Sequence, residues 1–198
     1  MKIVVFNHLS LDGVTQAPGR PDEDLRGGFE HGGWSLAYGD AVLGGYVAEG
    51  MATSGALLFG RRTYEDFFSV WPKRKEPNPF TKVLDATQKY VASRTLKNPL
   101  PWVNSTLLAG DAEDTVAQLR REPGKSVVIL GSAELVQSLQ RRNLIDEYQL
   151  TINPLILGKG KRLFSDSGRF ATLELVDTKP TTTGVIIATY RPRKEQNG

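Results

Sequence analysis

Short runs of apolar, β-branched residues recur along the chain and predict strands that are buried on both faces. The clearest runs cover residues 3–6, 56–59 and 126–130, and a glycine follows the second and the third of them. Weaker patterns predict five more strands, at residues 89–93, 102–108, 146–152, 172–178 and 185–191. The last two are joined by a short polar segment, which favours a closing antiparallel hairpin.

Apolar residues at helical spacing separate most of these strands and predict helices at residues 40–51, 63–70, 81–86, 111–121 and 132–141. Alternating strands and helices indicate a parallel sheet with helices on both faces. We therefore expect a three-layer αβα sandwich with a mixed, mostly parallel central sheet that ends in an antiparallel hairpin. No repeat or linker interrupts the pattern, so we expect one domain at residues 1–192 and a flexible tail at residues 193–198.

The composition narrows the possible chemistry. Of 198 residues, 39% are hydrophobic and 24% are charged, which is typical of a globular protein. The absence of cysteine excludes disulfides, cysteine-ligated metals and thiol nucleophiles. The two histidines, His8 and His31, form no HExxH pattern, so we expect no metal site. The first eight residues turn polar too early for a signal peptide and no run of 18 apolar residues occurs, so we expect a cytoplasmic protein without a membrane span.

The charge is mildly basic, with a net charge of +3 and a sequence pI near 9.1. The lysines and arginines form only short clusters, so solvated surface charge is the favoured interpretation and nucleic-acid binding the least favoured. A small phosphate-bearing ligand is another use for a few arginines.

Residues 16–39 form a long segment without periodicity that is rich in glycine, proline and aspartate. A loop of this length inside a domain is often functional, and it could act as a lid that keeps water out of an active site. It contains the acidic triplet Asp22-Glu23-Asp24. Because neighbouring carboxylates in a loop usually face water, we expect no acid–base role for this triplet.

Three predicted strands end in residues that suit a phosphate group. Backbone N–H groups at a helix start, small side chains and guanidinium groups all favour bound phosphate, and ligands of open α/β sheets lie beyond the carboxyl ends of the strands. A standard GxGxxG fingerprint is absent. For the first of these segments, an alternative to phosphate binding has equal weight: Thr63 is an ordinary helix cap and the arginines are surface charge. The segments are Gly60-Arg61-Arg62-Thr63, Ser93-Arg94-Thr95 and Gly131-Ser132-Ala133.

Together with two further motifs, these segments resemble the dihydrofolate reductase-like family, in particular the branch of the C-terminal reductase domain of bacterial riboflavin biosynthesis. The further motifs are Ser10-Leu11-Asp12-Gly13 and the stretch from residue 144 to residue 164. The motifs occur in the family's order and span nearly the whole chain. The resemblance implies a dihydrofolate reductase-like fold and an NADPH-dependent reductase that acts on a small heterocyclic or carbonyl-bearing substrate, of pterin or pyrimidine type among others.

The resemblance also implies where the cofactor binds. The turn Gly60, Arg61, Arg62 and Thr63 would contact its phosphates, and Ser93, Arg94 and Thr95 would hold the adenosine 2′-phosphate. Family members often carry Gly-Gly, with an unusual peptide geometry, where this chain has Gly131-Ser132. The serine departs from that pattern but still permits contacts from Gly131, Ser132, Ala133 and Leu135.

The resemblance implies less about catalysis. Asp12 is the candidate catalytic and substrate-contacting residue, with Gly13, Trp34 and Leu155 beside the substrate; alternatively, Asp12 and Gly13 simply form a turn. The carboxylate that dihydrofolate reductase carries on its first helix has no secure counterpart, because nothing in the sequence orients Asp40. We expect His8 to be a buried, hydrogen-bonded histidine rather than an acid. An aromatic wall from Trp34, Tyr38, Trp71 and Phe80 is less favoured than packing.

Two function classes are compatible with these residues and motifs. The first is a reductase whose partners are NADPH, a small-molecule substrate and a second copy of the chain in a homodimer. The second is a nucleotide-binding protein without catalysis, which would bind NADPH but reduce no acceptor.

Overall fold

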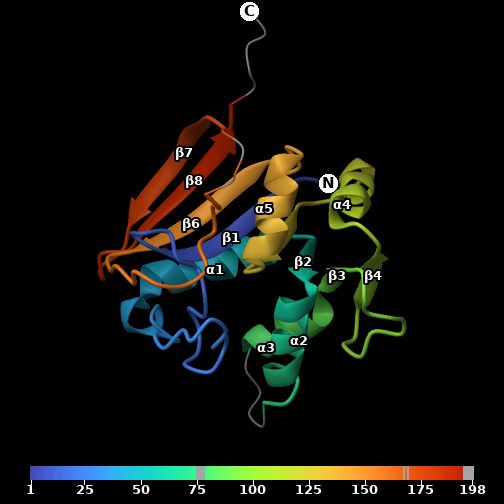
Figure 1. Cartoon of the computed structure of the whole chain (residues 1–198), viewed down its shortest axis with the longest axis horizontal. Coiled ribbons are helices and arrows are strands. Elements are labelled where there is room, and N and C mark those ends of the chain that lie inside the picture. Colours follow the sequence, from blue (N-terminus) through green and yellow to red (C-terminus); the bar gives the residue numbers. More distant parts are fainter. Residues whose placement is uncertain (75–78, 167, 169, 194–198) are drawn as a thin grey trace, which may run out of the picture.

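Eight strands form one sheet in the computed structural model, which describes residues 1–74, 79–166, 168 and 170–193 (Figure 1). The strand order across the sheet is β4-β3-β2-β5-β1-β6-β8-β7. The first six strands in this order run parallel, whereas β8 is antiparallel to β6 and to β7. The strands are β1 (Ile3–Ser10), β2 (Ala56–Gly60), β3 (Gln88–Ser93), β4 (Ser105–Ala109), β5 (Val127–Leu130), β6 (Glu147–Asn153), β7 (Leu173–Pro180) and β8 (Ile186–Pro192).

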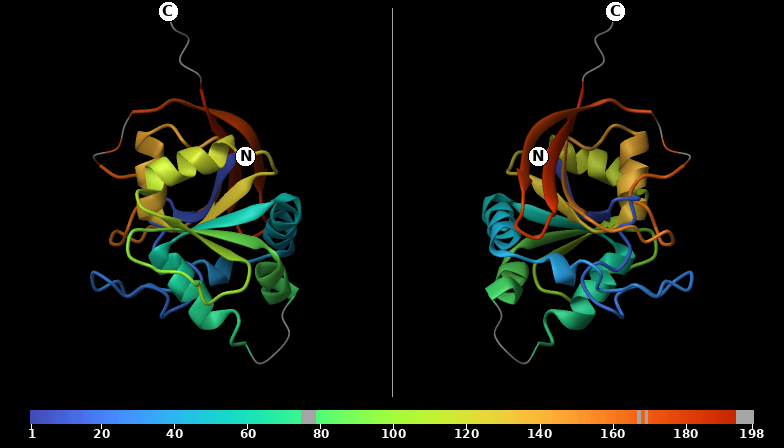
Figure 2. Two further views of the ribbon diagram at one scale, coloured as in Figure 1. Left: turned by 90° about the vertical axis from the view of Figure 1, so that its right-hand side faces the viewer. Right: turned by 90° about the vertical axis from the view of Figure 1, so that its left-hand side faces the viewer.

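Helices cover both faces of the sheet (Figure 2). Helices α1 (Ala41–Thr53), α2 (Arg61–Val70) and α3 (Pro79–Ala86) lie on one face, and α4 (Ala112–Arg121) and α5 (Ala133–Arg141) lie on the other. A single 3₁₀ turn, Leu36–Tyr38, precedes α1. This is the expected αβα sandwich with its closing hairpin. Within the described ranges, none of the helices combines the length and apolarity that crossing a bilayer requires.

Side-chain alternation along β1 explains why the sheet is buried on both faces. Ile3 and Val5 pack under α4 and α5, whereas Val4 and Phe6 pack on the side of α1, α2 and α3. Because β1 lies between β5 and β6 in the centre of the sheet, both layers of helices close over it. Because β1, β2, β3 and β5 run parallel, their carboxyl ends meet at one edge of the sheet.

The long loop at residues 16–39 has a small core of its own. Val14, Ala17, Phe29 and Trp34 are all buried against one another. Gly160 belongs to this packing, because an added Cβ would lie only 2.6 Å from Val14 Cγ1. The loop is therefore a packed unit, in spite of its lack of periodicity.

Several predicted boundaries differ from the structure. The strand predicted at residues 102–108 begins only at Ser105, because the Trp102 indole is buried in the core and donates a hydrogen bond to Asp85 (2.7 Å). The first strand continues past residue 6 to Ser10, and α2 begins at Arg61 rather than at residue 63. The expected flexible tail lies outside the described residues from residue 194 onward.

Candidate active site

A cavity of about 950 Å³ opens beyond the carboxyl ends of β1, β2, β3 and β5. In open α/β sheets this is the edge where ligands bind. All the residues that the sequence proposed for a cofactor line this one cavity: Gly60, Arg61, Arg62, Thr63, Ser93, Arg94, Thr95, Gly131, Ser132, Ala133 and Leu135.

Two helices begin at this cavity without a side-chain cap. Gly60 precedes α2 and Ser132 precedes α5, and neither residue's side chain accepts a hydrogen bond from the first helical turn. Thr63 therefore lies inside the first turn of α2 and is not its cap. Uncapped N–H groups and the positive end of the helix dipole favour an anion at both positions.

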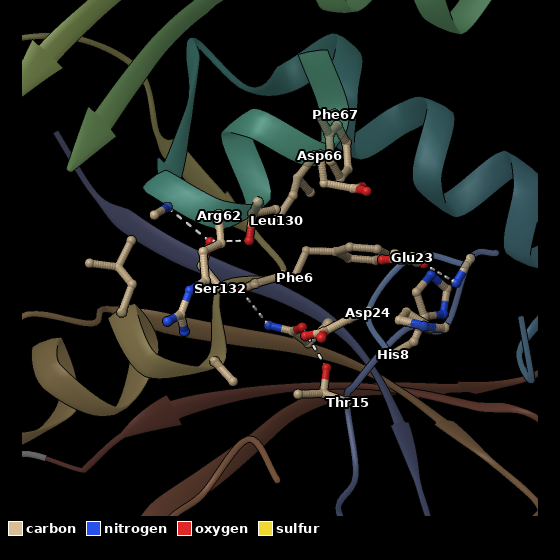
Figure 3. A pocket seen from close by; sticks show the side chains of 18 of the residues that line it. Phe6, His8, Thr15, Glu23, Asp24, Arg62, Asp66, Phe67, Leu130 and Ser132 are labelled. Carbon is tan, nitrogen blue, oxygen red and sulfur yellow. Dashed lines mark hydrogen bonds between the residues drawn. The ribbon is translucent and has the colours of Figure 1, made fainter. Parts of the chain in front are cut away.

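Ser132 joins the two helix starts. Its Oγ accepts a hydrogen bond from Gly60 N (2.9 Å) and donates one to Thr63 Oγ1 (2.8 Å), as Figure 3 shows. Gly131 and Ser132 both have left-handed backbones, with φ of 63° and 58°. The peptide between them is not cis; the described residues contain one cis peptide, Asn98–Pro99. The serine that departs from the family's Gly-Gly thus cross-links the two loops.

The end of β3 forms the third wall of this part of the cavity. Ser93 Oγ accepts hydrogen bonds from Thr95 N (3.1 Å) and Leu96 N (3.0 Å), which closes a tight turn. Arg61 Nη1 donates to Thr95 Oγ1 (2.8 Å), so the β2 and β3 ends are connected. Arg94 is exposed and has no hydrogen-bond or ion-pair partner among the described residues. Its guanidinium group is available to a ligand.

A charged cluster lies beside the start of α5. Glu134 pairs with Lys161 (2.6 Å) and with Arg62 (3.0 Å). The hydrogen bond from Lys161 is the main reason why the pKa of Glu134 lies below its ordinary value. Arg62 and Glu134 are well exposed and Lys161 is partly exposed, so these pairs contribute little stability and can rearrange around a bound anion.

Aromatic side chains line the other part of the cavity. Trp71 and Phe80, two members of the proposed aromatic wall, line it and meet edge to face with ring centroids 4.8 Å apart. The other two, Trp34 and Tyr38, do not line it. Sequence reasoning missed Phe6, Tyr46 and Phe67, which also line the cavity. For Phe6 a signal was available, since it ends the first apolar run at the ligand edge.

His8 lies on the β1 side of the cavity. Its Nδ1 is 2.7 Å from the hydroxyl of Thr151, a fully buried residue of β6. Burial lowers the pKa of His8 to about 4. His8 is thus hydrogen-bonded, as expected, and is a neutral imidazole near pH 7.

The structure places the predicted substrate residues away from this cavity: Asp12, Gly13, Trp34 and Leu155 do not line it. The Asp12 carboxylate accepts hydrogen bonds from the hydroxyl of Ser10 (2.7 Å), from Leu157 N (3.1 Å) and from Gly158 N (2.9 Å). The Ser10 hydrogen bond, followed by those from the two backbone N–H groups, lowers the pKa of Asp12 to about 2. This carboxylate holds a turn together, and the geometry gives no support to a catalytic role.

Trp34, Gly13 and Leu155 likewise have structural positions. The Trp34 indole donates to Gln16 O (2.7 Å) and packs in the core of the long loop, with Leu155 against it. Gly13 occupies a left-handed turn position with φ of 79°. The substrate-binding assignments of these residues stay predictions, without support from the geometry of the cavity.

The long loop itself lines the cavity, and other parts of the chain hold its first residues. Gln16 Oε1 accepts a hydrogen bond from Lys161 N (2.9 Å), and Arg20 forms a two-point ion pair with Asp66 of α2 (2.6 and 3.2 Å). Glu23 and Asp24 both line the cavity, so the expectation that the acidic triplet faces water is wrong for two of its three members.

Comparisons with known proteins agree with this geometry. The family model of the RibD C-terminal domain matches residues 1–187. The uncharacterized protein YyaP of Bacillus subtilis is 31% identical over 140 residues, which are 68% of this chain and 72% of YyaP.

Solved structures show the same fold. A putative riboflavin biosynthesis protein from Shewanella superposes with a TM-score of 0.69 at 22% identity, over 98% of this chain and all of that one. Dihydrofolate reductase from Enterococcus faecalis, solved with NADP(H), superposes with a TM-score of 0.59 at 15% identity, over 98% and 97% of the two chains. At these identities the likeness concerns the fold alone.

Proposed function

Because the chain belongs to the RibD C-terminal domain family, we propose that it is an NADPH-dependent reductase that transfers hydride to a small heterocyclic or carbonyl-bearing substrate. One observation carries this proposal. Three strand ends, far apart in the sequence, bring every residue proposed for the cofactor to the wall of a single cavity. The Enterococcus reductase, which has this fold, was solved with NADP(H).

The residues present fit a dinucleotide phosphate. Two uncapped helix starts, at Arg61 and Ala133, face the cavity beside the guanidinium groups of Arg61 and Arg62. Gly131 permits a close approach of a ligand to the backbone, because it has no side chain and its φ of 63° favours glycine. The volume of about 950 Å³ is at the upper end for ligand pockets, which suits a large cofactor with a small substrate.

Preference for NADPH over NADH would come from the end of β3. Arg94 has no partner there among the described residues and lies next to Ser93 and Thr95, so a 2′-phosphate could take charge-assisted hydrogen bonds from its guanidinium group. NADH lacks this phosphate and would leave Arg94 without a partner.

When bound, the dihydronicotinamide supplies the hydride, and the chain supplies orientation and a dry site. Phe67, Trp71 and Phe80 provide flat apolar walls for a planar substrate. The Arg20–Asp66 ion pair holds the long loop against α2, beside these walls, where it would limit the access of water to a bound substrate.

Fluorescence titration of the purified protein with NADPH and NADH tests the proposal, with Arg94→Ala and Arg61→Ala as variants. Arg121→Ala is the matched control, because Arg121 is an exposed arginine at the end of α4, outside the cavity lining. We expect NADH to bind at least ~10-fold more weakly than NADPH, a difference of about 1.4 kcal/mol. Arg94→Ala should abolish that preference and Arg121→Ala should keep it. Failure of both nucleotides to bind would refute the proposed function.

A panel of pterin, pyrimidine and simple carbonyl acceptors then separates the two function classes. Oxidation of NADPH, followed by its absorbance, supports a reductase. Saturable NADPH binding without turnover of any acceptor would favour the non-catalytic nucleotide-binding protein. The expected homodimer and cytoplasmic location stay predictions.

A further inference from the structure

A carboxyl group of the long loop enters the cavity at the end away from the proposed phosphate site. Figure 3 shows Glu23 and His8 at one end of the view and Arg62 and Ser132 at the other. Glu23 is partly buried, and its Oε2 accepts hydrogen bonds from Gly19 N (2.7 Å) and Arg20 N (3.0 Å). In the part of the chain that the structure describes, Oε1 forms no hydrogen bond. One oxygen is thus anchored and the other is free.

The next residue, Asp24, provides a contrast within the same loop. Burial alone would raise the pKa of Asp24, but hydrogen bonds from Arg26 hold it below the ordinary value. Burial raises the pKa of Glu23 as well, and the charge of Asp66 adds to the rise; the hydrogen bonds from Gly19 and Arg20 and the charge of Arg20 only partly oppose it. Neighbouring carboxyl groups whose environments move their pKa values apart are typical of acid–base assignments in active sites.

The cation nearest to Glu23 is already engaged. Arg20 directs its guanidinium group at Asp66 (2.6 and 3.2 Å) and at Asp22 (3.2 Å). Among the described residues, Glu23 itself has no ion-pair partner. Because no cation among these residues is paired with its carboxylate, Glu23 can hold a proton.

The other titratable groups that face Glu23 or line this end of the cavity are poorer proton donors. His8 is unprotonated near neutral pH, since its pKa is about 4. Asp66 is committed to Arg20, and burial raises the pKa of the Tyr46 phenol above its already high ordinary value. Asp40 caps α1, with Leu43 N and Thr182 N as its donors (2.8 and 2.7 Å), and lies outside the cavity lining.

We propose that Glu23 is the catalytic acid of this enzyme and that it protonates the substrate from Oε1; this inference rests on the proposed reductase function. The electron-poor carbon of a substrate C=N or C=O bond accepts the hydride. The electron pair of that double bond moves to the nitrogen or oxygen, which takes the proton as the Oε1–H bond breaks. The substrate gains two electrons and two hydrogens, NADPH is left oxidised, and the Glu23 carboxylate regains a proton from water.

The geometry also provides a variant that separates the acid from the anchor. A glutamine at position 23 keeps an oxygen acceptor for Gly19 N and Arg20 N, but it has no acidic proton. Glu23→Gln should therefore preserve the loop and NADPH affinity within about twofold. Hydride transfer in a single turnover should fall by about 10²- to 10³-fold, as is typical on losing a general acid. Asp22→Asn, at the exposed neighbouring carboxylate, should retain normal transfer.

The pH profile gives a readout that a merely structural role would not change. In the wild type, transfer should decrease about tenfold per pH unit above the pKa of Glu23, because the acid form is required. This decrease should be absent in Glu23→Gln. A Glu23→Gln variant that transfers hydride within about threefold of the wild type, with the same profile, would overturn the proposal.

Carboxyl ¹³C NMR provides a test that needs no acceptor. The Glu23 signal is assigned as the one missing from Glu23→Gln, and it should titrate at higher pH than the chain's exposed glutamates. If the Glu23 signal titrates at the same pH as the exposed glutamates, or at lower pH, Glu23 is not the catalytic acid. The reductase function would still stand in that case, provided that the wild type binds NADPH. If the wild type does not bind NADPH, the reductase function fails first and this inference fails with it.

Discussion

The cross-link made by Ser132 gives a prediction whose size follows from the structure. Ser132→Ala removes the oxygen that accepts from Gly60 N (2.9 Å) and donates to Thr63 Oγ1 (2.8 Å). Leaving a partly buried N–H without its acceptor costs about 1–2 kcal/mol, and loss of the second hydrogen bond adds about 0.5–1 kcal/mol. We therefore expect a loss of about 2 kcal/mol in the free energy of unfolding, equivalent to a decrease of about 4–8 °C in Tm for a chain of this size.

Ser132→Gly loses the same two hydrogen bonds but should be less damaging. The φ of 58° at this position is left-handed, which costs L-residues about 1–2 kcal/mol and costs glycine almost nothing. We expect the glycine variant to be about 1 kcal/mol more stable than the alanine variant. Urea unfolding followed by tryptophan fluorescence measures both, with Ser69→Ala as a control. Ser69 is an exposed helical serine whose side chain, among the described residues, bonds only to Asp66 O in the preceding turn.

Two results would contradict these roles of Ser132: an alanine variant as stable as the wild type, or alanine and glycine variants of equal stability. The first result would mean that the two hydrogen bonds add no stability. The second would mean that the left-handed backbone carries no strain. NADPH titration of both variants is informative as well, since Ser132 positions the two helix starts proposed for the phosphates.

Two further predictions concern side chains with structural roles, the buried Tyr64 of α2 and Asp12. Tyr64→Phe should lower the free energy of unfolding, measured in urea, by about 1–2 kcal/mol. The reason is that the buried backbone N–H of Trp102 loses its acceptor, the Tyr64 hydroxyl at 3.1 Å. An unchanged unfolding midpoint would contradict this role. Asp12→Asn should flatten the acid dependence of stability. The folded pKa of about 2 lies below the ordinary 3.8, so the carboxylate stabilises the fold above pH 3.8 and this stabilisation is lost as the pH falls towards 2. Unfolding curves at several pH values should show the wild type losing more stability than the variant over this interval, and parallel losses would exclude the role.

Much of the fold could be predicted because periodicity is a local property. The runs at residues 56–59 and 126–130 became β2 and β5 with boundaries within one residue. The first strand was predicted too short, because its second half includes Asn7, His8 and Ser10. These polar residues are tolerated in a central strand since β6 supplies partners, such as the Thr151 hydroxyl for His8.

The cofactor side of the site was predictable for a related reason. Parallel strands place their carboxyl ends at one edge, so a glycine, arginine or serine that follows a strand is positioned by the strand itself. For Gly131 and Ser132, the sequence predicted only that the turn permits contacts with the cofactor. Its cross-link to Gly60 and Thr63 joins residues about 70 positions apart.

The substrate side was decided by tertiary contacts. Asp12 looked chemically promising in the sequence, yet its carboxylate is occupied by Leu157 and Gly158, some 145 positions away. Glu23 looked like an ordinary loop carboxylate in the sequence. In the structure, contacts of Arg20 with Asp66 of α2 and of Gln16 with Lys161 hold the loop beside the cavity. Apolar spacing and the residues that follow a strand can be recognised in the sequence, because they depend on the backbone of their immediate neighbours. The direction in which an aperiodic loop turns its carboxylates depends on partners that only the folded chain brings together.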